Sequence, residues 1–186
     1  MNVPVRLSRY IETDKQRNFS RDFLAGWEHF ETWEQARVGE VAPAQNTFAI
    51  TEEDILAYNK ACGETDPLMV DPDYARQHSS TGELLQHPIF VTTIGFYSVG
   101  DRGIGTWMRT PGARNPGQRI EIIAPFHYGE IITTTVTTLD KFLQRGKAYL
   151  QMLLDFHNQA SELKARWWCS LILPASRSDV SRFANA

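Results

Sequence analysis

The stretch from Tyr58 to Phe90, YNKACGETDPLMVDPDYARQHSSTGELLQHPIF, contains the signals that decide the fold. It predicts the end of one helix, a tight acidic loop, a second short helix and the approach to a buried helix. Gly63 and Pro67 are chain breakers, so the first helix must end there. The rest of the chain reads as a sheet that wraps the buried helix.

Three carboxylates, Glu64, Asp66 and Asp71, fall within this short loop. One explanation is turn chemistry, because an Asp before a proline is a common turn and helix-start signal. The other is acid–base chemistry in a functional site. Taken alone, the loop favours the first explanation.

The same residues resemble the MaoC-like (R-specific enoyl-CoA hydratase) family, whose pattern is A-[SC]-G-D-x-N-P-[LI]-H-x-D-x-x-x-A. The segment Ala61–Ala75, ACGETDPLMVDPDYA, keeps that frame without a gap, and the frame continues to Leu85–Pro88, where the family opens its central helix. The resemblance covers residues 30–174. It implies an α+β hot-dog fold, in which an antiparallel β-sheet is wrapped around a central buried helix.

The chain departs from this family at the positions that carry its chemistry. The family's acid–base Asp and His fall at Glu64 and Met69, and a thioether has no titratable proton. The family's oxyanion N–H falls at Pro88, which has none. General acid–base catalysis contributes ~10²–10⁴-fold and one oxyanion donor ~10²–10³ in kcat, so little of the usual hydration chemistry is expected. The segment is more similar to the non-catalytic, N-terminal half of double hot-dog and heterodimeric members.

His87 is the histidine that the resemblance brings near the cleft, and an imidazole can titrate near neutrality. One hypothesis is that Glu64 and His87 form a substitute catalytic acid/base pair. The competing and favoured interpretation is a histidine that holds the loop at the start of the helix by a hydrogen bond. The candidate substrate-binding residues are Asp66, Met69, Pro88, Phe90, Arg109 and Arg114.

Arg109 and Arg114 belong to a Gly/Pro-rich loop predicted for residues 102–119. Arginines near a hot-dog cleft could contact the phosphates of coenzyme A or of a phosphopantetheine arm. A solvated loop is the ordinary alternative and is slightly favoured.

The remaining elements follow from local patterns. Thr51 and Asp54 predict a capping box at the start of a helix that ends near Cys62, with Tyr58 and Cys62 on its core side. The helix over Ile89–Val99 is apolar nearly all round, which predicts burial. Strand-like runs are predicted at residues 118–126, 131–139, 148–156 and 163–171.

We expect three parts: an N-terminal arm (1–29), the hot-dog domain (30–174) and a loose C-terminal tail (175–186). The chain has 186 residues, 42% hydrophobic residues and a net charge of −3, which does not suit a nucleic-acid-binding protein. Two cysteines form no disulfide framework, and no apolar run reaches transmembrane length. We expect a cytoplasmic protein without membrane contact. The five histidines lack metal-site spacing, so neither a metal nor another cofactor is expected.

Three functions remain open from the sequence. The first is a subunit of an acyl-CoA or acyl-carrier hydratase/dehydratase, a lyase, whose degenerate site works beside a catalytic hot-dog partner. The second is a homodimeric enzyme with altered chemistry that uses Glu64 as its base. The third is a module that binds an acyl thioester without turnover. Hot-dog domains of this family pair sheet edge to sheet edge, so the resemblance implies a homodimer or a heterodimer.

Overall fold

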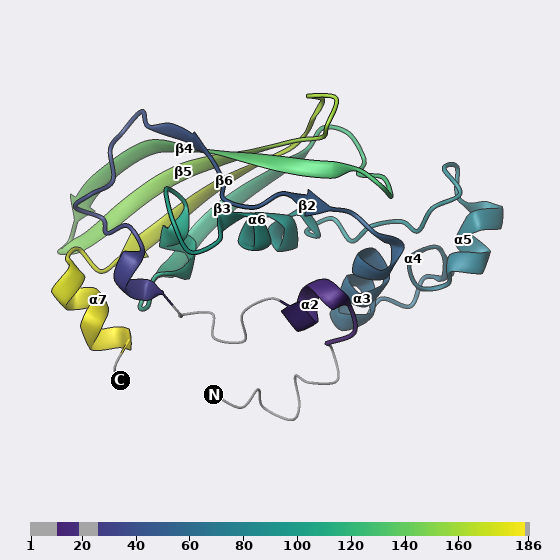
Figure 1. Ribbon diagram of the computed structural model, residues 1–186, viewed down its shortest axis with the longest axis horizontal. Coiled ribbons are helices and arrows are strands. Elements are labelled where there is room, and N and C mark those ends of the chain that lie inside the picture. The colour runs from purple at the N-terminus through teal and green to yellow at the C-terminus, as the bar shows by residue number, and fades with distance from the viewer. Residues whose placement is uncertain (1–10, 19–25, 185–186) are drawn as a thin grey trace.

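The computed structural model describes residues 11–18 and 26–184, and Figure 1 shows a curved sheet with a helix against its concave face. The strands are β1 (Val41–Pro43), β2 (Phe48–Ala49), β3 (Arg114–Ile122), β4 (Ile131–Gln144), β5 (Lys147–His157) and β6 (Leu163–Leu173). Their order is β1-β4-β5-β6-β3, β2 also pairs with β4, and all pairs are antiparallel. The predicted α+β architecture is therefore confirmed. Most of the arm expected for residues 1–29 lies outside the described residues.

The two central strands, β4 and β5, form a hairpin that is longer than predicted. Arg145 and Gly146 join them with φ values of 50° and 72°. A two-residue turn with both φ values positive matches the right-handed twist of the flanking strands. Because this turn lies beyond the end of the β-branched run at Leu139, β4 continues to Gln144. Alternate residues such as Val136 and Leu154 point inward and are fully buried.

The helix α6 (Val91–Val99) lies in the concavity of the sheet. A Cβ added to Gly95 would lie 2.9 Å from Trp167 Cζ3, so this part of the helix backbone packs directly on β6. The predicted burial of this helix is confirmed along the face that packs on the sheet, where Val91, Ile94, Gly95, Ser98 and Val99 are buried. Ile94 is fully buried, but Ile89, just before the helix, is 43% exposed and Phe96 is 36% exposed.

The acidic loop forms its short helices through local caps. In α3 (Glu52–Cys62) the predicted capping box is present, with Thr51 as the N-cap. Asp66 caps α4 (Pro67–Val70) and Asp71 caps α5 (Pro72–His78), which confirms the turn-chemistry explanation for these two carboxylates. Cys62 is exposed rather than in the core, because it is the last residue of its helix.

Four further short helices complete the described chain. They are α2 (Asp14–Asn18), η1 (Trp27–His29), η2 (Thr106–Arg109) and α7 (Arg177–Ala184). The loop predicted for residues 102–119 is shorter than expected, because η2 lies within it and β3 already begins at Arg114. The tail was predicted to be loose, but it is helical as far as Ala184. Arg177 fixes this helix by donating to the carbonyls of Trp27 and Phe30, and the Val180 side chain is buried. Within the described residues, no helix is long and apolar enough to cross a membrane.

Candidate functional site

Glu64 lies just beyond the C-terminus of α3. The helix ends at Gly63, which adopts the left-handed conformation at φ 80°. The N–H of Glu64 then turns back and donates to the carbonyl of Asn59 at 3.1 Å. The Glu64 side chain is partly exposed.

His87 lies on the segment that leads into α6, and its Nε2 is 3.4 Å from Oε1 of Glu64. Its other ring nitrogen, Nδ1, accepts the N–H of Ile89 at 3.3 Å. In the neutral imidazole one nitrogen carries the proton and the other accepts, so the proton lies on Nε2, the nitrogen near Glu64. Nδ1 thus holds the start of the helix by a hydrogen bond, as expected, while Nε2 faces a carboxylate.

Asn59 connects the two loops that carry this pair, and no motif in the sequence indicates this role. Its side chain is fully buried. Its Nδ2 donates to the carbonyls of Met69 and Leu85, both at 2.8 Å, and its Oδ1 accepts the N–H of His87 at 3.0 Å. In the sequence, Asn59 stands out only as a polar residue on the same helix face as Ile55. A single Asn in a helix is usually solvated, so this position does not indicate a buried role.

A cavity of about 340 Å³ opens beside His87. Its lining is mostly apolar and includes Pro88, Phe90 and Ile122. The start of the helix offers few donors to this space. Pro88 has no N–H, the N–H of Ile89 is used by His87 Nδ1, and the N–H of Phe90 donates to the His87 carbonyl at 2.9 Å. These three positions therefore provide no free oxyanion donor.

Comparison with known proteins yields structural matches only. No protein-family model matches the sequence, and neither does any curated protein. A MaoC-like dehydratase from Rhodospirillum rubrum superposes with a TM-score of 0.63 at 20% identity, over 78% of this chain and 98% of that one. R-hydratase PhaJ1 from Pseudomonas aeruginosa gives 0.62 at 19% identity, over 78% and 86%. The HadBC 3R-hydroxyacyl-ACP dehydratase complex from Mycobacterium tuberculosis gives 0.63 at 16% identity, over 75% and 98%.

The chain has a hot-dog fold. At these identities the matches establish the fold alone, in agreement with the expectation from the Tyr58–Phe90 stretch. In hot-dog terms, α6 is the central helix. The Glu64–His87 pair lies beside the N-terminal approach to that helix.

The other predicted site residues of this hot-dog domain occupy diverse positions. Asp66 Oδ1 accepts the N–H of Leu68, so this carboxylate is used as a cap. Met69 is half-buried and its carbonyl is held by Asn59. Arg109 is only 4% exposed, with its guanidinium over the Phe30 ring and donating to the carbonyl of Gly100.

Arg114 is the more accessible of the two arginines. It is exposed at the first position of β3. Ile122, at the other end of β3, lines the cavity beside His87, but neither Arg109 nor Arg114 is among the residues that line it.

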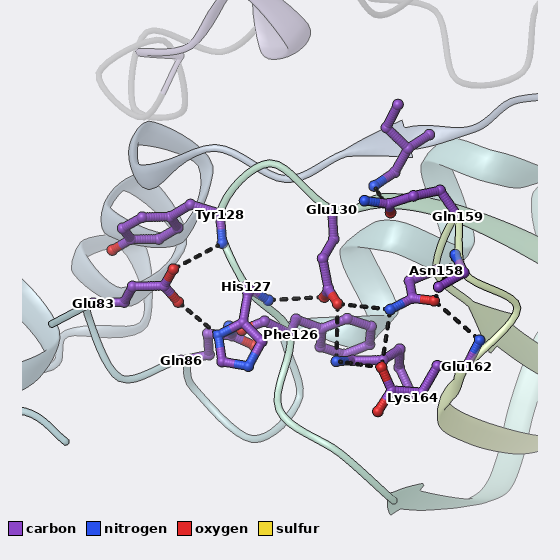
Figure 2. A network of polar contacts seen from close by, with 12 residues as sticks. Glu83, Gln86, Phe126, His127, Tyr128, Glu130, Asn158, Gln159, Glu162 and Lys164 are labelled. Atoms are coloured by element: carbon purple, nitrogen blue, oxygen red, sulfur yellow. Dashed lines mark hydrogen bonds and ion pairs between the residues drawn. The ribbon is translucent and has the colours of Figure 1, made fainter. Parts of the chain in front are cut away.

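A network of polar contacts attaches the segment before α6 to the turn between β3 and β4 (Figure 2). His127 Nδ1 lies 2.9 Å from Oε2 of Glu83, and the N–H of Leu84 donates to the Tyr128 hydroxyl at 2.8 Å. Gln86 Nε2 donates to the carbonyl of Phe126. These contacts to the turn hold the segment that carries His87 independently of Asn59. Desolvation by burial raises the pKa of Tyr128 to about 12, so its hydroxyl stays protonated near neutrality.

The same network continues to a buried ion pair, also drawn in Figure 2. Lys164 is 2% exposed and its Nζ donates to Oε1 of Glu130 at 2.9 Å. Burial acts to raise the pKa of Glu130, but hydrogen bonds from Asn158, from the His127 N–H and from Lys164 outweigh it and hold the pKa below its ordinary value. Glu130 is therefore a structural carboxylate. Among the described residues no group of His, Cys, Asp and Glu could hold a metal ion.

Proposed function

We propose that this hot-dog chain acts on acyl thioesters as a hydratase or dehydratase, with Glu64 and His87 as its acid/base pair. The supporting observation is the 3.4 Å approach of His87 Nε2 to Glu64 Oε1, together with the position of His87 in the lining of an apolar cavity. Catalytic contacts are often long in the absence of substrate and tighten when it binds. The shared fold with hydratases and dehydratases adds support at the level of the scaffold.

The chemistry needs one base and one proton donor. In hydration, Glu64 takes a proton from water as the water oxygen bonds to Cβ of the enoyl thioester. The electron pair of the double bond moves to Cα and the thioester carbonyl. The proton that Glu64 took from water then passes to Cα, which returns Glu64 to its carboxylate form. Dehydration is the reverse. The Nε2–H of His87 faces the carboxylate oxygen of Glu64 at 3.4 Å.

A second candidate is a degenerate subunit whose chemistry is done by a catalytic hot-dog partner. Two observations favour it: Met69 stands where the resemblance expects an imidazole, and positions 88–90 leave no free N–H for an oxyanion. Among the described strands, β3 pairs with β6 alone and forms an edge of the sheet, and the exposed Ile122 lies on this strand. A sheet edge of this kind can pair with a second hot-dog chain, either identical or different.

Enoyl-CoA hydration by the purified chain tests these proposals, with Glu64→Gln and Met69→His measured alongside and the oligomeric state determined on the same samples. Glu53→Gln is the matched control, because Glu53 is exposed on α3, the helix that ends just before Glu64. Turnover that Glu64→Gln removes and Glu53→Gln keeps supports the acid/base pair.

Turnover unaffected by Glu64→Gln contradicts the acid/base proposal. Absence of turnover, with a gain in Met69→His, supports the partner-dependent subunit. Binding of acyl-CoA or an acyl carrier without turnover in any variant indicates the binding module.

A further inference from the structure

We propose that Asn59 is a positioning residue that sets the approach of His87 to Glu64 by holding both of their backbones. The inference rests on the proposed function of this pair. Two backbone contacts motivate it. The N–H of Glu64 donates to the Asn59 carbonyl at 3.1 Å, and the N–H of His87 donates to Asn59 Oδ1 at 3.0 Å.

The side chain of Asn59 is fully used. Both Nδ2 hydrogens reach carbonyls, those of Met69 and Leu85, and Oδ1 accepts the N–H of His87. Two carbonyls on one side and an N–H on the other allow only one orientation of the amide. The residue thereby joins three stretches of chain: the end of α3, the loop with Met69 and the segment with His87.

No other side chain of this size offers the same set of contacts. Aspartate has the acceptor but neither donor, leucine has neither kind of group, and glutamine is one methylene longer. Because the site is completely buried, water does not replace a missing partner without a local rearrangement. Loss of the amide should therefore change the distance between the two loops.

The segment that carries His87 has a second, independent attachment. Glu83, Leu84 and Gln86 all contact the turn at residues 126–128. Leu85 also donates its N–H to the carbonyl of Leu68 at 2.9 Å. Removing the Asn59 side chain should thus shift His87 relative to Glu64 without releasing the segment.

The test is the response of the His87 ring to Glu64→Gln, measured by nuclear magnetic resonance on protein labelled with ¹⁵N-histidine. The pH is mildly alkaline, where imidazoles are neutral. In the wild-type background, Glu64→Gln should shift the His87 Nε2 signal. In the Asn59→Ala background the same substitution should shift it by less than half as much. Asn59→Ser, with the same expectation, replaces Asn59→Ala if the alanine variant does not fold.

Asn158→Ala is the matched control. Asn158 is also a buried asparagine with two Nδ2 bonds, but these lie in the Glu130 network. It should lower thermal stability and keep the full response of His87 to Glu64→Gln. An unchanged response in the Asn59 variants, or an equal loss in Asn158→Ala, would overturn the proposal.

The readout does not depend on turnover. Suppose that the His87 signal no longer responds to Glu64→Gln in the Asn59→Ala background, while Glu64→Gln leaves the activity intact. Asn59 then positions the two residues, but they are not the acid/base pair. A retained response with activity that requires Glu64 means that the pair is catalytic and Asn59 does not set it.

Discussion

His87 brings its Nε2 to 3.4 Å from Oε1 of Glu64, although the two residues lie on different loops. Each loop reaches that position by donating a backbone N–H to one residue of α3, Asn59. The contact therefore depends on α3. It requires that this helix end at Gly63 and that Asn59, in its last turn, accept the N–H of His87.

Replacing His87 with alanine tests the acid/base pair directly. We expect kcat/KM for enoyl thioester hydration to fall by about 10²–10⁴-fold, the usual contribution of a general acid or base. His29→Ala serves as the control, since His29 is exposed on η1. Full activity in His87→Ala would end the hypothesis that this imidazole takes part in the chemistry.

The pH dependence of stability should carry a contribution from Glu130. Its hydrogen bonds lower its pKa in the folded state, so folding favours the carboxylate. This contribution is present above the ordinary carboxyl pKa and is lost as the pH falls through the lower, folded-state pKa. Melting curves between about pH 7 and pH 3 should show a smaller acid-induced loss of Tm in Glu130→Gln than in the wild type. Equal losses in both proteins would show that Glu130 does not contribute.

Gly95→Ala tests the contact between the central helix and the sheet. The added Cβ would meet Trp167 Cζ3 at 2.9 Å, and an overpacked core typically loses about 1–3 kcal/mol of unfolding free energy. Gly117→Ala on β3 is the control, because nothing lies within 4 Å of its Cβ position. Denaturant unfolding of both variants measures the difference. Equal stabilities would mean that α6 can move away from β6 freely.

The two cysteines should differ in reactivity. Burial raises the pKa of Cys169 to about 12, and thiols react as thiolates. Cys62 is exposed at the end of α3. Titration of the native protein with an aromatic disulfide should modify Cys62 alone, and Cys62→Ser should abolish the reaction until the protein is unfolded. Rapid native modification of Cys62→Ser would show that the core around Cys169 opens.

The sequence by itself determined the features that depend on neighbouring residues. The capping box of Thr51 and Asp54 and the caps at Asp66 and Asp71 form within a few residues, so their chemistry is visible in the sequence. Alternating apolar residues likewise predicted the long strands, because successive side chains of a strand point to opposite faces. The frame of the acidic loop then led to the hot-dog fold through resemblance.

Only the tertiary structure decided which groups meet across the chain. The exposure of Phe96 on α6 depends on which part of the helix the sheet covers, and an apolar pattern does not record that. The burial of Arg109 follows from its partners at Phe30 and Gly100. The role of Asn59 was invisible for the same physical reason: its three side-chain partners are backbone groups, and backbone groups carry no sequence signal until folding brings them together.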